Sequence, residues 1–193
     1  MTTASGVAAI VVAGGAARRM GGIDKAMIEL GGTTLLDRVL RAAEPLCDQL
    51  VVVGPRRPTD VVGVEFTVED SPGGGPVPAV AAGLERVGAA SIVLVLAADL
   101  PVLTTEDLGQ LLAALETASR AGVAAATDHR QRPNPLLAAY RAPVLASCRM
   151  LQPGTPAASL LPDRNDVVLV DLGERATLNV NCATDLERAA ALL

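Results

Sequence analysis

Seven apolar runs rich in β-branched residues alternate along the chain with stretches in which apolar positions have helical spacing. The predicted strands are residues 7–13, 49–54, 64–69, 91–97, 122–127, 136–141 and 166–172. The predicted helices are residues 33–46, 78–88, 104–122 and 184–193. Several strands are apolar on both sides of the pleat, as a sheet covered by helices on both faces requires. The pattern therefore predicts an α/β fold built on a mostly parallel sheet.

Local signals mark element boundaries within this pattern. Thr104, followed by Glu106 and Asp107, predicts a helix start, because a hydroxyl caps free backbone N–H groups and acidic side chains favour the positive end of the helix dipole. The stretch SPGGGPVP, residues 71–78, predicts a loop.

No repeat or linker interrupts the 193 residues, half of which are hydrophobic. We therefore expect a single domain over residues 1–193.

The composition of the chain argues against several kinds of binding partner and structural site. The net charge of −5, with one Tyr, one Phe and no Trp, argues against a protein that binds a nucleic-acid backbone or stacks bases. Cys47, Cys148 and Cys182 are far apart and predict neither a disulfide framework nor a zinc site. The first residues, MTTASG, are not basic, and VAAIVVA is too short to span a bilayer. We expect a cytoplasmic protein that contacts neither nucleic acid nor membrane.

The only lysine lies in a glycine-rich segment after the first predicted strand, VVAGGAARRMGGIDKAMIEL, residues 11–30. Open α/β sheets bind ligands at the carboxyl ends of their strands. Gly14 and Gly15 let the backbone pass close to a ligand, and Arg19 and Lys25 supply positive charge. The segment is not a Walker A loop, because the lysine is flanked by an aspartate and an alanine. It predicts phosphate binding by another glycine-rich loop.

Carboxylates follow two further predicted strands. Asp99 ends the apolar run of LVLAADLPVL, and Pro101 then turns the chain away. A carboxylate there could hold Mg²⁺ between phosphates, because this ion takes one or two carboxylates together with substrate oxygens. The structural alternative is that Asp99 caps the turn. Asp70 precedes the glycine loop of residues 71–78 and by itself predicts little.

Together these segments resemble the molybdenum cofactor guanylyltransferases, within the nucleotidyltransferase superfamily. VAGGAARRMGGIDK resembles their signature loop, and its companions follow in order: Asp70 before GPVPA, Asp99 in ADLP, a PL…Y strand that ends at Tyr140, and NVNCATDL. The resemblance covers about residues 7–188. It implies a Rossmann-like three-layer α/β/α fold with a mostly parallel, mixed central sheet. It also implies transfer of GMP from Mg·GTP to the phosphate of molybdenum-molybdopterin, with release of pyrophosphate.

The resemblance implies roles for individual residues. Val12, Ala13 and Gly14 would line the guanine and ribose side, and Asp70 would contact the nucleoside. Arg19, Lys25 and Asp99 are the implied catalytic residues: the two basic side chains hold the triphosphate, and Asp99 binds the metal. The implied GTP-binding residues are Val12, Ala13, Gly14, Gly15, Lys25, Asp70 and Asp99.

Asn179 and Asn181, the two asparagines of NVN, would face the acceptor or the metal. Mg²⁺ is the implied cofactor. The implied partners are GTP and molybdenum-molybdopterin as substrates, and a hand-over of the acceptor from molybdenum insertion proteins is left open.

The chain departs from the family pattern at two loops. Family members commonly read GPLAG where this chain has GPVPA from Gly75, and often carry an asparagine where this chain has Gly54, so no role is assigned to Gly54. A molybdopterin cytidylyltransferase is the alternative, but its first loop typically reads LAAG and its later loop lacks GP. The presence of AGG and of Gly75-Pro76 favours guanine. Another small nucleotidyltransferase, or a non-catalytic nucleotide-binding homologue, stays a further alternative.

Overall fold

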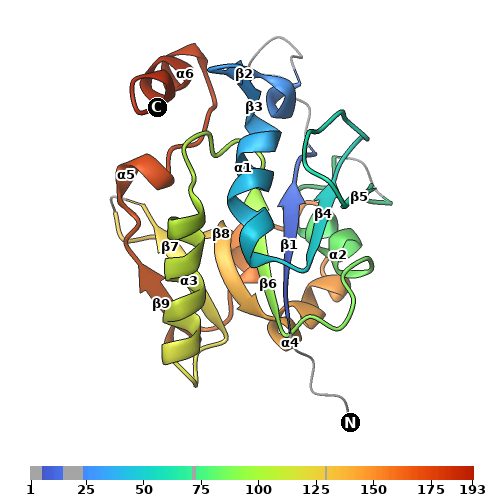
Figure 1. Ribbon diagram of the computed structural model, residues 1–193. Coiled ribbons are helices and arrows are strands. Elements are labelled where there is room, and N and C mark those ends of the chain that lie inside the picture. Colours follow the sequence, from blue (N-terminus) through green and yellow to red (C-terminus); the bar gives the residue numbers. More distant parts are fainter. Residues whose placement is uncertain (1–5, 15–23, 71–72, 129) are drawn as a thin grey trace.

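The computed structural model describes residues 6–14, 24–70, 73–128 and 130–193 (Figure 1). Its centre is a seven-stranded sheet in the order β5-β4-β1-β6-β8-β7-β9. The strands are β1 (Val7–Val12), β4 (Gln49–Val53), β5 (Val64–Thr67), β6 (Ile92–Ala97), β7 (Val123–Thr127), β8 (Pro133–Arg141) and β9 (Val167–Val170). All seven predicted strands are therefore confirmed.

One strand makes the sheet mixed. β8 pairs antiparallel with both β6 and β7, whereas the pairs β1-β4, β1-β6, β4-β5 and β7-β9 are parallel. Only residues 128–132 join β7 to β8, and so short a connection can join only antiparallel neighbours. The predicted α/β class with a mostly parallel, mixed sheet is confirmed.

Helices cover both faces of this sheet (Figure 1). The helices are α1 (Leu35–Ala43), α2 (Pro76–Leu84), α3 (Thr105–Thr117), α4 (Ala142–Leu145), α5 (Gly173–Ala176) and α6 (Ala183–Ala190). Short 3₁₀ turns are η2 (Lys25–Met27), η3 (Glu44–Leu46), η4 (Ala146–Met150), η5 (Ala157–Leu160) and η6 (Arg164–Asp166), and β2 (Glu29–Leu30) pairs with β3 (Thr33–Thr34) in a separate two-stranded sheet. The prediction that residues 1–193 form one domain stays a prediction.

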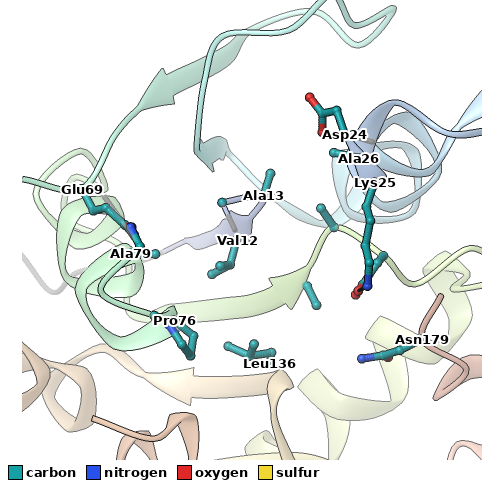
Figure 2. Close-up of a pocket in the computed structure, with 16 residues that line it drawn as sticks. Val12, Ala13, Asp24, Lys25, Ala26, Glu69, Pro76, Ala79, Leu136 and Asn179 are labelled. Atoms are coloured by element: carbon teal, nitrogen blue, oxygen red, sulfur yellow. Dashed lines mark hydrogen bonds and ion pairs between the residues drawn. The ribbon is translucent and has the colours of Figure 1, made fainter. Parts of the chain in front are cut away.

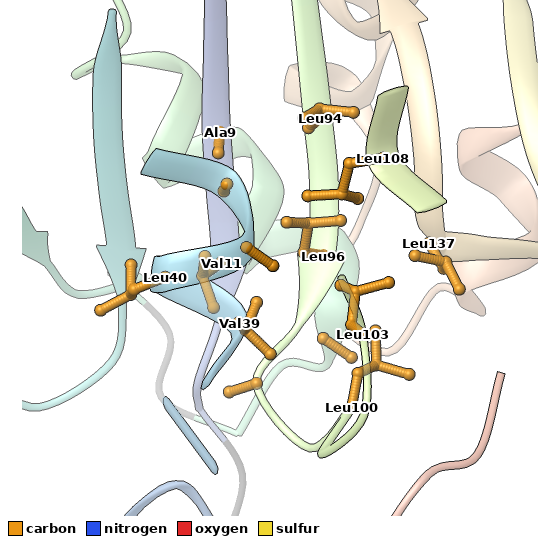
Figure 3. Packing of buried hydrophobic residues seen from close by; sticks show 14 of the residues in the cluster. Ala9, Val11, Val39, Leu40, Leu94, Leu96, Leu100, Leu103, Leu108 and Leu137 are labelled. Atoms are coloured by element: carbon orange, nitrogen blue, oxygen red, sulfur yellow. The ribbon is translucent and has the colours of Figure 1, made fainter. Parts of the chain in front are cut away.

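Alternation along the strands divides the core into two layers. Ala9 and Val11 of β1 pack in a buried cluster with apolar side chains of α1 and α3, which Figure 3 shows from close by. Ile10, between them, packs in a second cluster with side chains of α2. Successive side chains of a strand point to opposite faces, so an apolar strand buries both layers at once.

The predicted boundary at Thr104 is confirmed. Its hydroxyl accepts from the backbone N–H of Asp107, whose carboxylate accepts from the backbone N–H of Thr104, a reciprocal capping box. The predicted loop of residues 71–78 is wrong at its end, because α2 already begins at Pro76. Gly75, with a φ of +93°, turns the chain into that helix, and a proline suits a first helical position that needs no N–H partner.

Among the described residues, no helix combines the length and the apolar character that crossing a membrane would need.

Candidate active site

A cavity of about 530 Å³ opens where β1 and β6 end and α2 begins (Figure 2). Its walls come from segments far apart in the sequence: the end of β1, the turn around Lys25, the start of α2, the end of β6, and Leu136 of β8. The cavity thus lies at the carboxyl ends of adjacent parallel strands, where an open α/β sheet binds its ligands. Its size suits a nucleotide-sized ligand.

Lys25 reaches into this cavity from η2 and is held there by oxygen atoms. Its Nζ donates to the carbonyl oxygen of Val180, 2.8 Å away, and to Oδ1 of Asn181, 2.9 Å away. Oδ2 of Asp99 lies 3.7 Å from the same nitrogen. The structure therefore brings together Lys25, Asp99 and Asn181, which are widely separated in the sequence.

Asp99 follows β6, and 21% of its side chain is exposed. Burial raises the pKa of this carboxyl group above its ordinary value, and the positive charge of Lys25 opposes that rise without cancelling it. The carbonyl oxygen of Asp99 accepts from the backbone N–H of Val180 at 3.0 Å. This hydrogen bond ties the segment that carries both asparagines to the end of β6.

Asn179 lines the same cavity, and its Oδ1 is buried without a hydrogen-bond partner among the described residues. A buried amide oxygen without a donor is costly. The described residues contain no cluster of three or more His, Cys, Asp or Glu side chains that could hold a metal. Asp99 and Asn179 do offer the hard oxygen ligands that Mg²⁺ prefers, but the remaining ligands would have to come from substrate or water.

The opposite part of the cavity has apolar walls. Val12, Ala13 and Gly14 line it, and Gly75 and Pro76 line it from the start of α2. The nucleoside role that the family resemblance implies for the first three residues stays a prediction. The N–H of Ala98 donates to the carbonyl oxygen of Val12 at 3.1 Å, which fixes the end of β1 against the end of β6.

Other predicted site residues either do not line the cavity or lie outside the residues that the structure describes. Asp70 is exposed and does not line the cavity, whereas its neighbour Glu69 does. The role predicted for Asp70 therefore stays a prediction without a cavity contact to support it. Gly15 and Arg19 lie outside the described residues.

Arg57 is a residue that the sequence analysis missed. Its Nε donates to Oδ2 of Asp24 at 2.7 Å, and another guanidinium nitrogen donates to the carbonyl oxygen of Ala13 at 3.0 Å. Both acceptors belong to residues that line the cavity. In the sequence Arg57 is the second of two adjacent arginines after a strand, and nothing there distinguishes it from Arg56.

Known proteins match this chain in sequence. The model of the MobA-like NTP transferase domain matches residues 9–167. A probable molybdenum cofactor guanylyltransferase of Mycobacterium avium is 32% identical, over 95% of this chain and 95% of that protein. Molybdenum cofactor guanylyltransferases of Bradyrhizobium and of Shewanella are 38% and 33% identical over 58% and 65% of this chain. Those two alignments span 57% and 64% of the relatives' lengths.

Solved structures share the fold at lower identity. A molybdopterin-guanine dinucleotide biosynthesis protein A from Archaeoglobus fulgidus has a TM-score of 0.72 at 23% identity, covering 96% of this chain and 97% of that one. A 2-C-methyl-D-erythritol 4-phosphate cytidylyltransferase from Thermus thermophilus has a TM-score of 0.67 at 21% identity, covering 95% of this chain and 97% of that one. The fold is thus shared by proteins named for guanine and for cytosine nucleotides.

Proposed function

This chain belongs to the MobA-like NTP transferase family and is a nucleotidyltransferase, and from that premise we propose that it transfers GMP from Mg·GTP to the phosphate of molybdenum-molybdopterin, releasing pyrophosphate. The observation that carries the proposal is the meeting of Lys25, Asp99 and the segment with both asparagines at one cavity. We place the reaction in the cytoplasm, where GTP is available.

Lys25 is suited to hold a phosphate group. An ammonium group has three hydrogens to donate. Two of them go to Val180 and Asn181, and Asp99 lies beyond hydrogen-bond distance at 3.7 Å. The two bonds fix the nitrogen in place, and the third hydrogen is left for a phosphate oxygen. A charge held in position before the reaction stabilises the transition state without reorganisation.

The residues present fit a magnesium ion bound together with GTP. Asp99 and Asn179 would hold it, because a carboxylate and an unpartnered amide oxygen are ligands of the right kind. When bound, the ion neutralises negative charge on the phosphates. The proposal for Asn179 also accounts for its buried oxygen atom.

The chain's own residues act mainly by placing the substrates. The residues at the end of β1 would hold the nucleoside, and Lys25 would neutralise charge that builds up as an acceptor phosphate oxygen attacks the α-phosphorus and pyrophosphate leaves. The acceptor phosphate is deprotonated near neutral pH, so no general base is needed. Positioning and electrostatics then account for the acceleration. Arg19 would add a second positive charge, as the family resemblance implies.

The guanine preference rests on two sequence features that adjoin the cavity. Gly14 and the Gly75-Pro76 pair, which favour guanine in the sequence pattern, both line it. A cytidylyltransferase is the second candidate, because a cytidylyltransferase that acts on 2-C-methyl-D-erythritol 4-phosphate shares the fold with a TM-score of 0.67.

Turnover with the four nucleotides tests the proposal. Pyrophosphate release is measured with molybdenum-molybdopterin and Mg²⁺, and with GTP, CTP, ATP or UTP in turn. We expect release with GTP to exceed that with the other nucleotides by at least about tenfold, equivalent to roughly 1.4 kcal/mol. Faster release with CTP would assign the chain to the cytidylyl branch. Binding of GTP without release in any mixture would indicate a non-catalytic homologue.

A further inference from the structure

The guanidinium group of Arg57 is almost completely buried against residues that line the cavity, with 8% of the side chain exposed. Each of its three nitrogens donates to an oxygen atom: Nε to Asp24 at 2.7 Å, one terminal nitrogen to the carbonyl of Ala13 at 3.0 Å, and the other to the carbonyl of Pro55 at 3.2 Å. Burying a charge is costly unless it is paired and hydrogen-bonded, and this one is both.

The two distant acceptors belong to opposite sides of the cavity. Ala13 directly follows β1 on the apolar side, and Asp24 immediately precedes Lys25 on the charged side. The N–H of Ala13 donates to the carbonyl of Val53 at 2.9 Å, so its peptide groups are bonded to the end of β4 and to Arg57. One guanidinium group therefore links the apolar wall to the turn that carries the lysine, and the N–H of Ala13 joins the same wall to the end of β4.

Gly54 leaves the space for this link. Its φ is +153°, and a Cβ atom there would lie 2.9 Å from the carbonyl oxygen of Ala13 and 3.0 Å from a terminal nitrogen of Arg57. A side chain at this position would push apart the two groups that are hydrogen-bonded to each other. The hydrogen bond between Arg57 and Ala13 therefore depends on a glycine at position 54.

We propose that Arg57 is a positioning residue of the nucleotide cavity, which sets the distance between the wall formed by Ala13 and the turn that carries Lys25. The inference rests on the proposed function, because it assigns Arg57 a part in presenting that lysine to a triphosphate. Arg57 itself does not line the cavity, and it acts through Ala13 and Asp24.

Lysine could not replace Arg57 in this role. The guanidinium group offers donors on three nitrogens in a fixed plane, whereas an ammonium group places all its hydrogens on one atom. Arg57→Lys keeps the charge near Asp24 but loses the simultaneous contact with Ala13. A role in stability alone would make this variant less stable without changing the kinetics of its folded molecules.

The test compares Arg57→Lys with Arg56→Lys, a matched control one residue away. The Arg56 guanidinium lies over the ring of Phe66, 5.7 Å from its centroid, whereas the hydrogen bonds to Ala13 and Asp24 come from Arg57. Each variant is first shown to be folded at the assay temperature. We expect Arg57→Lys to lower kcat/KM for GTP by about a hundredfold, the scale of a misplacement of about 1 Å, and Arg56→Lys to leave it unchanged.

Amide hydrogen exchange gives a second readout that needs no turnover. Exchange should accelerate in residues 11–14 and in residues 24–28 together in Arg57→Lys, and in neither segment in Arg56→Lys. Adding Asp24→Asn to Arg57→Lys should lower kcat/KM much less than it does in the wild-type protein, because the link between Ala13 and Asp24 is already broken at Ala13 in Arg57→Lys. Normal kinetics and exchange in folded Arg57→Lys would overturn the inference. A wild-type protein without GTP turnover would instead refute the proposed function, and exchange would still decide whether Arg57 links the two segments.

Discussion

At the scale of single residues, the cavity places a cation and a carboxylate together without forming a close ion pair. Nζ of Lys25 is 3.7 Å from Asp99 and shorter distances join it to two uncharged oxygen atoms. Burial of Asp99 also outweighs the favourable charge of Lys25 in setting the pKa of that carboxyl group. This geometry leaves both groups able to contact a shared ligand, as the proposed function requires.

Lys25→Ala tests the contribution of the ammonium group. The variant should fold normally by circular dichroism, because the lysine lies at the cavity and the core clusters do not include it. Pyrophosphate release should fall by about a hundredfold or more, the scale of losing one preorganised charge contact. Arg120→Ala, which removes the same charge from an exposed position after α3, should keep wild-type turnover. Normal turnover of Lys25→Ala would refute a phosphate-binding role.

Asp99→Asn should change the pH dependence of stability, and its Mg²⁺-dependent turnover separates a ligand-binding carboxylate from a structural cap. Because the native pKa of Asp99 is raised, the folded protein binds this proton more tightly than the unfolded chain does. The contribution of Asp99 to the free energy of unfolding is therefore largest below the unfolded pKa, about 3.9, and declines as the pH rises through the native pKa.

The Asp99→Asn variant lacks this pH-dependent decline in the free energy of unfolding, because an asparagine does not titrate. Urea denaturation at pH 7 should find it at least as stable as the wild-type protein, whereas Mg²⁺-dependent turnover should fall by about a hundredfold and metal-free GTP binding should change little. Its stability relative to wild type should increase between the two pKa values as the pH rises. If Asp99 served only to cap the turn, turnover and its Mg²⁺ dependence would match those of the wild-type protein.

At the scale of elements, the sequence predicted which segments are strands better than it predicted whether neighbouring strands run parallel or antiparallel. Apolar runs report burial, and all seven proved to be strands. β8 is antiparallel because its connection to β7 is short and because it pairs with β6. The hydrophobic periodicity of the sequence does not indicate strand pairing. β8 also begins at Pro133, three residues before the predicted start, because a proline is tolerated as the first residue of a strand.

The candidate site was predictable only where local sequence carries the chemistry. Glycines and a solitary lysine after a strand indicate a phosphate loop, so Gly14 and Lys25 could be found. The contacts of Lys25 with Val180 and Asn181 span more than 150 positions and depend on the folded chain. The different surroundings of Arg57 and Arg56 likewise arise only when β4 lies beside β1.

Two glycines in helices test how closely α2 packs against β1. A Cβ atom at Gly83 would lie 2.6 Å from Cγ2 of Ile10, whereas one at Gly109, in α3, would meet nothing within 4 Å. Gly83→Ala should therefore lower the free energy of unfolding by about 1–3 kcal/mol through overpacking. Gly109→Ala should raise it by up to about 1 kcal/mol, because alanine favours the helix. Urea denaturation checks both, and a Gly83→Ala variant as stable as the wild-type protein would contradict this account of the interface.

At the scale of the whole molecule, the fold cannot by itself choose the nucleotide. The TM-scores of 0.72 and 0.67 place this chain close to structures named for guanine and for cytosine chemistry alike. Under the proposed function, selectivity would come from the walls of the cavity, which the end of β1 and the start of α2 both line. A measurement on the whole folded protein can detect it, because a ligand that binds only the folded state raises its stability by mass action.

Thermal unfolding with GTP or CTP measures that selectivity without the acceptor. At a concentration one hundred times its Kd, GTP should stabilise the protein by about 2.7 kcal/mol. CTP bound tenfold more weakly should contribute about 1.4 kcal/mol less at the same concentration. For a chain of this size 1 kcal/mol corresponds to about 2–4 °C, so GTP should raise Tm by roughly 3–6 °C more than CTP. Lys25→Ala should reduce both shifts, because each triphosphate loses the same contact, and should preserve their order. A larger shift with CTP would identify cytosine as the preferred base and would leave the phosphate-binding role of Lys25 intact.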